Sequence, residues 1–140
     1  PECDLKEWIP NPDEFNREIT DSQWKAQVYR CMRRIPTLEE PSRKRGVVDL
    51  YDVSDDWLPI YDSTRIKGYY MAIGSSGNQF KNAPIAGHCM AELIEACEKG
   101  QNHDEDPVQV KTVYTGLTLN MGFYSRNREI NPNSSFSVNG

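Results

Sequence analysis

The stretch GYYMAIGSSGNQFKNAPIAGHCMAELI, residues 68–94, decides the fold of this chain. Its apolar run at residues 69–73 is the best strand candidate, and we expect it to be buried on both faces. A small polar loop follows at residues 74–81, and an amphipathic segment begins behind Pro84. A strand, a glycine-containing loop and a helix in this order predict an α/β chain, or an α+β fragment of one.

The helix behind the loop is predicted to run to about Lys99. Asn82 can cap its start, and Pro84 in the first turn has no N–H to leave unsatisfied. Gly100 is placed to end it. Its expected buried stripe consists of Ile85, Met90, Leu93, Ile94 and Cys97.

A second helix is predicted from about residue 21 to residue 35, behind an extended arm at residues 1–20. Thr20 and Gln23 form a candidate capping box, and Pro36 ends the element. Its apolar residues recur at helical spacing and share one face: Trp24, Val28, Cys31, Met32 and Ile35.

The remaining segments predict short strands and turns. Val47–Ser54 is rich in β-branched and aromatic residues, which indicates a strand. Trp57–Tyr61 is predicted as an edge strand because Pro59 cannot donate to a ladder, and residues 62–67 are predicted as a hairpin turn.

The C-terminal third is more polar. Residues 101–107 are predicted to form an acidic linker, and residues 108–125 alternate enough to indicate one or two short strands. We expect the Asn- and Ser-rich tail at residues 127–140 to be irregular.

Composition and charge narrow the function. The 140 residues, 37% of them hydrophobic, carry a formal net charge of −5. This argues against a nucleic-acid partner, and we interpret the one basic cluster, residues 42–46, as a solvated loop. No apolar run reaches the roughly 18–20 residues of a membrane span. We expect a cytoplasmic protein, or a mitochondrial-matrix protein if it is eukaryotic.

The four cysteines do not suggest a metal site. They lie at positions 3, 31, 89 and 97, so no two form a C-x-x-C pair. On the helix predicted behind the loop, Cys89 and Cys97 are expected to be small buried hydrophobes. No metal site is predicted.

The loop at residues 74–81 has the composition of an anion or oxygen site. Gly74 and Gly77 allow close backbone approach, and a helix start offers unpaired N–H groups and the positive end of its dipole. Lys81 adds a full charge. The spacing matches neither G-x-x-x-x-G-K-[ST] nor G-x-G-x-x-G. A tight strand-to-helix turn without a ligand is the alternative reading of the same residues.

Three segments together resemble one family. GYYMAIGSSGNQFKNAP resembles the last flavin-contacting segment of FAD-dependent oxidoreductases of the D-amino-acid-oxidase type, which include sarcosine oxidase, glycine oxidase and dimethylglycine dehydrogenase. GVVDLYDVSDDWLPIYD resembles a strand pair of that family, and GFYSRNREINPNSSFSV resembles some of its C-terminal tails. The likeness is good over residues 46–94 and weaker at residues 11–40 and 108–138.

The resemblance implies roles for individual residues. The loop would lie against the pyrimidine edge of the flavin of FAD, Lys81 would hold a substrate carboxylate, and Tyr51 would line the pocket over the ring. Asp49 stands where some sarcosine oxidases attach flavin through cysteine, so the FAD would be non-covalent. For Lys81 and Tyr51, a surface lysine and simple strand packing remain the alternatives, and His88 is interpreted as a helix-surface residue. The implied cofactor-binding residues are Gly74, Ser75, Ser76, Gly77, Asn78, Gln79, Phe80 and Lys81.

The resemblance also implies how the chain is organised. Residues 1–45 would end a substrate domain, residues 46–100 would supply the last strands, loop and helix of an FAD domain, and residues 101–140 would follow as linker, short strands and tail. The expected partners are the remaining FAD and substrate domains and a small amine or amino acid. Two other hypotheses are an interaction module that kept the fold without FAD and a subunit whose partner chain carries the dinucleotide motif.

Overall fold

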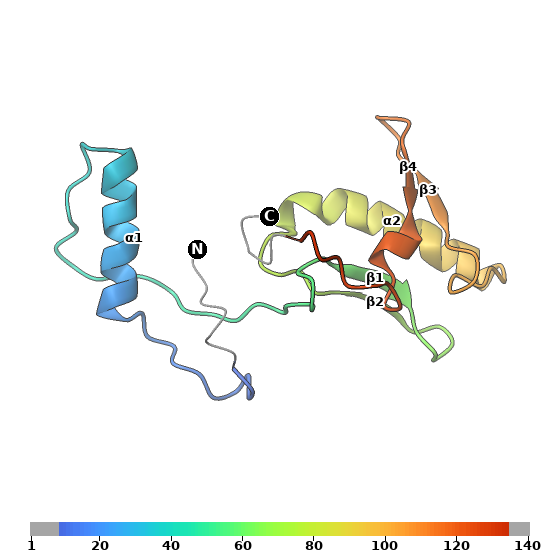
Figure 1. Cartoon of the computed structure of the whole chain (residues 1–140), viewed down its shortest axis with the longest axis horizontal. Helices are drawn as coiled ribbons and strands as arrows, with labels where there is room; N and C mark the ends of the chain where they lie inside the picture. Colours follow the sequence, from blue (N-terminus) through green and yellow to red (C-terminus); the bar gives the residue numbers. More distant parts are fainter. Residues whose placement is uncertain (1–8, 135–140) are drawn as a thin grey trace. The chain divides into compact units, whose positions relative to one another are not determined.

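A computed structural model describes residues 9–134 as two units, residues 9–50 and residues 51–134 (Figure 1). The described part is α+β, as predicted at that coarse level, with two α-helices and two antiparallel hairpins. The predicted arm before residue 9, including Cys3, and the tail after residue 134 lie outside it. The elements are α1 (Asp21–Arg34), β1 (Ile60–Ser63), β2 (Tyr70–Ile73), η1 (Phe80–Asn82), α2 (Ala83–Glu98), β3 (Gln109–Lys111), β4 (Thr118–Asn120) and η2 (Met121–Tyr124).

The unit of residues 9–50 contains the helix predicted at about residues 21–35, which is confirmed as α1. The Thr20 hydroxyl accepts a hydrogen bond from the Gln23 N–H at 3.3 Å, so Thr20 caps the helix. The Ile35 N–H donates to the Cys31 carbonyl and marks the end before Pro36. None of the residues of α1 is buried.

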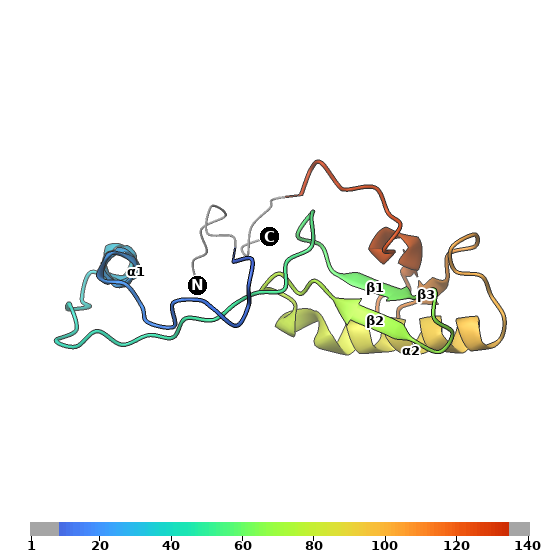
Figure 2. The same cartoon turned by 90° about the horizontal axis from the view of Figure 1, so that it is seen from below.

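The β1–β2 hairpin leads to the loop of interest. The strands pair antiparallel, from Ile60 opposite Ile73 to Ser63 opposite Tyr70. β2 confirms the strand predicted at residues 69–73, but the expected burial on both faces is wrong, because Ile73 is 50% exposed. The hairpin is a separate two-stranded sheet, and α2 runs along it (Figure 2).

Two predicted strands do not form as expected. Residues 47–54 are irregular, and Val47 is 93% exposed. The carbonyl of Asp52 accepts from the Ser76 N–H, in a loop contact rather than a strand ladder. Trp57 belongs to a turn with φ 61°, closed by its N–H to the Ser54 carbonyl, so the predicted edge strand of residues 57–61 is wrong before Ile60.

The predicted hairpin turn is displaced along the chain. Asp62 and Ser63 belong to β1, and the turn lies at residues 64–69, where the Thr64 N–H donates to the Tyr69 carbonyl at 3.0 Å. Asp62 stays in the strand because its carboxylate is buried and fully engaged, as described below. The prediction from turn-forming residue types alone therefore put the hairpin turn two residues too early in the chain.

α2 confirms the helix predicted behind the loop but not its whole buried stripe. Pro84 lies in its first turn, and the Gly100 N–H donates to the Cys97 carbonyl just beyond its end. Ile85 and Ile94 are 37% and 36% exposed, so their predicted burial is wrong. The hydrophobic core consists of Tyr61, Cys89, Leu93, Val108, Val110 and Met121, with Met90 and Cys97 packed against it.

The C-terminal third is more firmly held than a linker and an irregular tail suggest. β3 and β4 confirm the short strands predicted within residues 108–125, and Val110 lies opposite Leu119. Residues 127–134 of the predicted tail contain no helix or strand, as predicted. In the predicted linker, His103 is buried, and its Nδ1 accepts the Val108 N–H at 3.1 Å.

Two buried ion pairs fix the irregular segment to the first half of the unit. Asp56 accepts from Arg128 Nε at 2.9 Å and Nη2 at 2.5 Å. Asp62 accepts the Arg126 N–H at 2.7 Å, and Arg126 Nη1 lies 2.9 Å from the same carboxylate. His103 Nε2 is 3.6 Å from Asp62. A buried carboxylate is tolerated when cationic and N–H donors surround it, so these pairs hold the chain ends of the unit together.

Within residues 9–134, no helix has the length and apolar character needed to cross a membrane.

Candidate functional site

The loop between β2 and η1 has an unusual backbone. Gly74, Ser76 and Gly77 have φ angles of 69°, 48° and 74°, all in the left-handed region. A non-glycine residue there is uncommon, and Ser76 is also fully buried. Its hydroxyl donates to the Gly74 carbonyl at 3.2 Å. The loop is thus a fixed structure that returns the chain sharply from the strand to the helix.

Tyr51 packs against this loop. A Cβ added to Gly77 would lie 2.6 Å from the Tyr51 ring, closer than side chains normally approach. Only glycine suits this position, because it tolerates a positive φ and has no Cβ to collide with the ring. Tyr51 and Gly77, both predicted from the sequence as site residues, are therefore in contact, although the strand predicted around Tyr51 does not form. Tyr51 keeps 36% of its surface exposed.

Asp52 holds the first half of the loop. Its carboxylate accepts the Gly74 N–H at 2.8 Å and the Ser75 N–H at 3.0 Å, and it also accepts the Ser75 hydroxyl. Burial opposes its ionisation, but these hydrogen bonds lower the pKa of Asp52 below 3.8. The N–H donors of Gly74 and Ser75 are consequently already occupied.

The second half of the loop leaves its donors open. Among the described residues, the N–H groups of Gly77, Gln79, Phe80 and Lys81 donate no hydrogen bond. They precede or open η1, which continues directly into α2. The start of a helix carries positive partial charge and unsatisfied donors. This arrangement can bind an anion or a carbonyl oxygen that becomes negatively charged.

The side chains around these donors differ in their availability. The amides of Asn78, Gln79 and Asn82 bond to one another, with Asn82 Nδ2 donating to Gln79 Oε1 at 2.8 Å. Asn82 therefore stands at the N-cap of α2 without capping it through its side chain. Phe80 is 97% exposed, and Lys81 is also exposed, with no ion pair or hydrogen bond of its side chain inside residues 9–134.

His88 lies away from these groups. Its Nε2 is 3.3 Å from the carbonyl of Lys111 on β3, which matches its interpretation as a packed helix-surface residue. In the part of the chain that is described, no three His, Cys, Asp or Glu side chains could together hold a metal ion.

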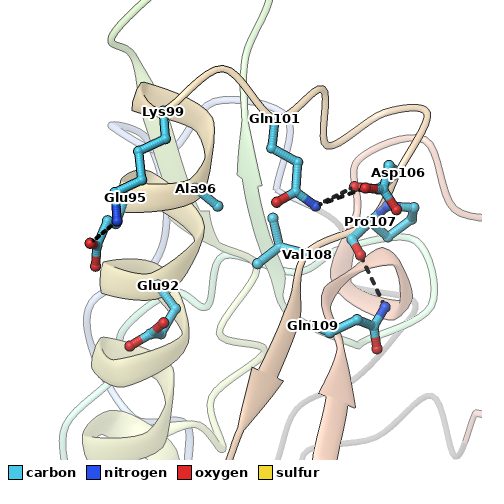
Figure 3. A pocket seen from close by; sticks show the side chains of 9 residues that line it. All are labelled: Glu92, Glu95, Ala96, Lys99, Gln101, Asp106, Pro107, Val108 and Gln109. Carbon is cyan, nitrogen blue, oxygen red and sulfur yellow. Dashed lines mark hydrogen bonds and ion pairs between the residues drawn. The ribbon is translucent and has the colours of Figure 1, made fainter.

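A groove of about 610 Å³ lies elsewhere, beside the C-terminal half of α2 (Figure 3). Four of its polar side chains bind one another: Lys99 pairs with Glu95, and Gln101 donates to Asp106. It contains none of the loop residues. Its lining consists of Glu92, Glu95, Ala96, Lys99, Gln101, Asp106, Pro107, Val108 and Gln109.

Sequence reasoning missed the carboxylates that support the site. Asp52 holds the loop directly, and Asp56 organises the adjacent turn by accepting the Ser54 hydroxyl at 3.2 Å and the Leu58 N–H at 3.1 Å. Ser54 in turn lies beside Gly74, where an added Cβ would be 3.2 Å from the Ser54 Cβ. The only available signal was several aspartates in DVSDD, which does not indicate which of them are engaged.

Comparisons of the chain with models of protein families, with curated proteins and with solved structures give no match to any of them.

Proposed function

We propose that this chain is the C-terminal part of an FAD-dependent oxidoreductase of the D-amino-acid-oxidase type, which oxidises a C–N bond of a small amine or amino acid. The observation that carries the proposal is the row of unpaired N–H groups at Gly77, Gln79, Phe80 and Lys81, directly before α2. The resemblance of GYYMAIGSSGNQFKNAP to a flavin-contacting segment supports the same assignment.

The donor set fits the pyrimidine edge of a flavin. When bound, FAD would supply the acceptor for a hydride from the carbon next to the amine nitrogen, and negative charge would develop near N1 and the C2 carbonyl. Fixed N–H donors aimed at a developing charge stabilise it without reorganisation. A helix terminus contributes about 1–2 kcal/mol in favourable geometry, or roughly 20–45 mV in a two-electron potential.

Two side chains would act on the substrate in this proposal. Lys81 is exposed and free of ion pairs among residues 9–134, so its ammonium can bind a substrate carboxylate as a point charge. Tyr51 is fixed by its contact with Gly77 and would line the substrate side of the loop. Water would then hydrolyse the imine product to a carbonyl compound and an amine or ammonia.

The first test uses the complete gene product that carries this sequence. We expect it to purify with the visible absorption of flavin and to release FAD, not FMN, without proteolysis. Anaerobic addition of an amine or amino acid from a panel should bleach the absorption. A gene product without flavin, even after incubation with FAD, would contradict the proposal and favour the interaction-module hypothesis.

The second test concerns Lys81. Lys81→Ala should raise the KM for a carboxylate-bearing amine by about 10- to 100-fold, because a hydrogen bond to a charged group contributes roughly 1.5–3 kcal/mol. Flavin content should stay unchanged. Lys67→Ala is the matched control, since Lys67 is an exposed lysine of the β1–β2 turn. Equal KM values in the two variants would remove the role of Lys81 in binding substrate.

A further inference from the structure

We propose that Asp52 is a positioning residue of the flavin loop: it binds the N–H donors of the first half of the loop and leaves only the N–H donors of the second half for a ligand. This inference rests on the proposed function, because it assigns a task to the loop. Asp52 lies 22 residues before Gly74. It was not among the residues that the motif indicated.

The contacts of Asp52 all go to the loop. One carboxylate oxygen accepts the N–H groups of Gly74 and Ser75, the other accepts the Ser75 hydroxyl, and the main-chain carbonyl accepts the Ser76 N–H at 3.0 Å. No other charged side chain of the described residues pairs with it. Four hydrogen bonds from one residue thus fix three consecutive loop residues.

The loop needs such an external support. Ser76 has a φ of 48° and is not glycine, so its backbone conformation persists only when the surroundings enforce it. The neighbouring Tyr51 ring limits Gly77 from one side. Asp52 and Tyr51 are adjacent in sequence and hold consecutive parts of the loop. Tyr51 and Asp52, which precede β1, therefore support a loop that follows β2.

The contacts of Asp52 decide which N–H donors of the loop remain available to a ligand. Because Asp52 occupies the N–H groups of Gly74 and Ser75, a ligand meets only those of Gly77, Gln79, Phe80 and Lys81. If the carboxylate were replaced by an amide, the amide oxygen could still accept both N–H groups and the NH₂ group could donate to the Ser75 hydroxyl, but the negative charge that strengthens these hydrogen bonds would be lost. The first half of the loop could then relax, and the remaining donors would lose their alignment.

The test has one readout without flavin and one with it. In the 140-residue chain, the amide NMR signals of Gly74 and Ser75 should titrate together with a midpoint below 3.8, and this titration should disappear in Asp52→Asn. In the flavin-loaded gene product, Asp52→Asn should raise the dissociation constant of FAD at least tenfold at a temperature where circular dichroism shows it folded. Asp52→Glu, which keeps the charge, should recover most of the affinity.

Asp55→Asn is the matched control, because Asp55 is an exposed carboxylate three residues from Asp52 in the same segment. It should change neither the amide titration nor the FAD affinity. If the gene product holds no flavin, the proposed function fails, and the amide titration still decides whether Asp52 holds the loop. If flavin is bound and Asp52→Asn leaves its affinity at the wild-type value, or if the Gly74 and Ser75 signals do not titrate, the positioning role is overturned.

Discussion

At the scale of single residues, two glycines with the same backbone have different surroundings. Gly68 and Gly77 have φ angles of 76° and 74°, but no atom lies within 4 Å of a Cβ added to Gly68. At Gly77 that Cβ would meet the Tyr51 ring. Substituting Gly68 and Gly77 in turn therefore distinguishes the free-energy cost of a left-handed backbone from the additional cost of a steric collision.

Gly68→Ala is expected to lower the free energy of unfolding by about 1 kcal/mol, which is the conformational penalty alone. Gly77→Ala should lower it by about 2–4 kcal/mol, because overpacking adds roughly 1–3 kcal/mol. Urea unfolding monitored by circular dichroism measures both values. In Gly77→Ala combined with Tyr51→Ala, the two effects should be less than additive. Equal losses in the two single variants would show that Tyr51 does not press on the loop.

The pair of Asp56 and Arg128 makes a second residue-scale prediction. Arg128→Ala leaves a buried carboxylate without its cation and should cost about 3 kcal/mol of unfolding free energy. Arg65→Ala, which removes an exposed arginine from the β1–β2 turn, is the control and should cost less than about 0.5 kcal/mol. A similar effect of both substitutions would mean that the pair contributes no net stability.

The same pair predicts a pH dependence. The hydrogen bonds from Arg128, opposed by burial, lower the pKa of Asp56 from 3.8 to about 2. A depressed folded-state pKa adds stability above pH 3.8 that is lost as the pH falls toward 2, here about 2 kcal/mol. Unfolding titrations of Asp56→Asn should lack this part of the acid slope. An unchanged slope would assign the acid sensitivity to other carboxylates.

At the scale of elements, local sequence signals succeeded where an element is set by its own residues. α1 was predictable because a cap, a periodic apolar face and a proline agree. The strand at residues 47–54 was not, because a strand also needs a partner, and the backbone there bonds to the loop instead. The position of the candidate site followed from its glycines and the helix start. The role of Asp52 could not be predicted, because no local pattern marks a carboxylate whose N–H donors come 22 residues later.

α2 gives a prediction at this scale, because adjacent residues of the predicted stripe have different burial. Leu93 has no exposed surface, whereas Ile94 is 36% exposed. Leu93→Ala should cost about 2–5 kcal/mol of unfolding free energy, since it opens a cavity in the core. Ile94→Ala should cost less than about 1 kcal/mol. Denaturant unfolding of the two variants checks this, and a larger loss for Ile94 would mean that another surface covers that side of the helix.

At the scale of the whole molecule, the buried core lies entirely within residues 51–134. The 140 residues contain no G-x-G-x-x-G segment to bind a dinucleotide pyrophosphate. The loop donors alone would contact only one edge of a flavin. The proposed cofactor therefore needs contacts that these residues do not supply.

The isolated 140-residue chain is accordingly expected to bind FAD with a dissociation constant weaker than about 1 μM, or not at all. Titration calorimetry or quenching of flavin fluorescence measures this, with the complete gene product as the positive reference. Sub-micromolar binding by the isolated chain would show that its own residues suffice for the cofactor.

The ion pairs between residues 56 and 128 and between residues 62 and 126 also affect when this unit can fold during synthesis. A ribosome makes the aspartates first, and their carboxylates have no cationic partner until some seventy further codons have been translated. The native contacts of β1 thus cannot be completed while the nascent chain still lacks Arg126 and Arg128. A product that ends before residue 126 would lack both cations, so this unit could not complete its native contacts, and the apolar surface left exposed would make the product a target for chaperones and proteases.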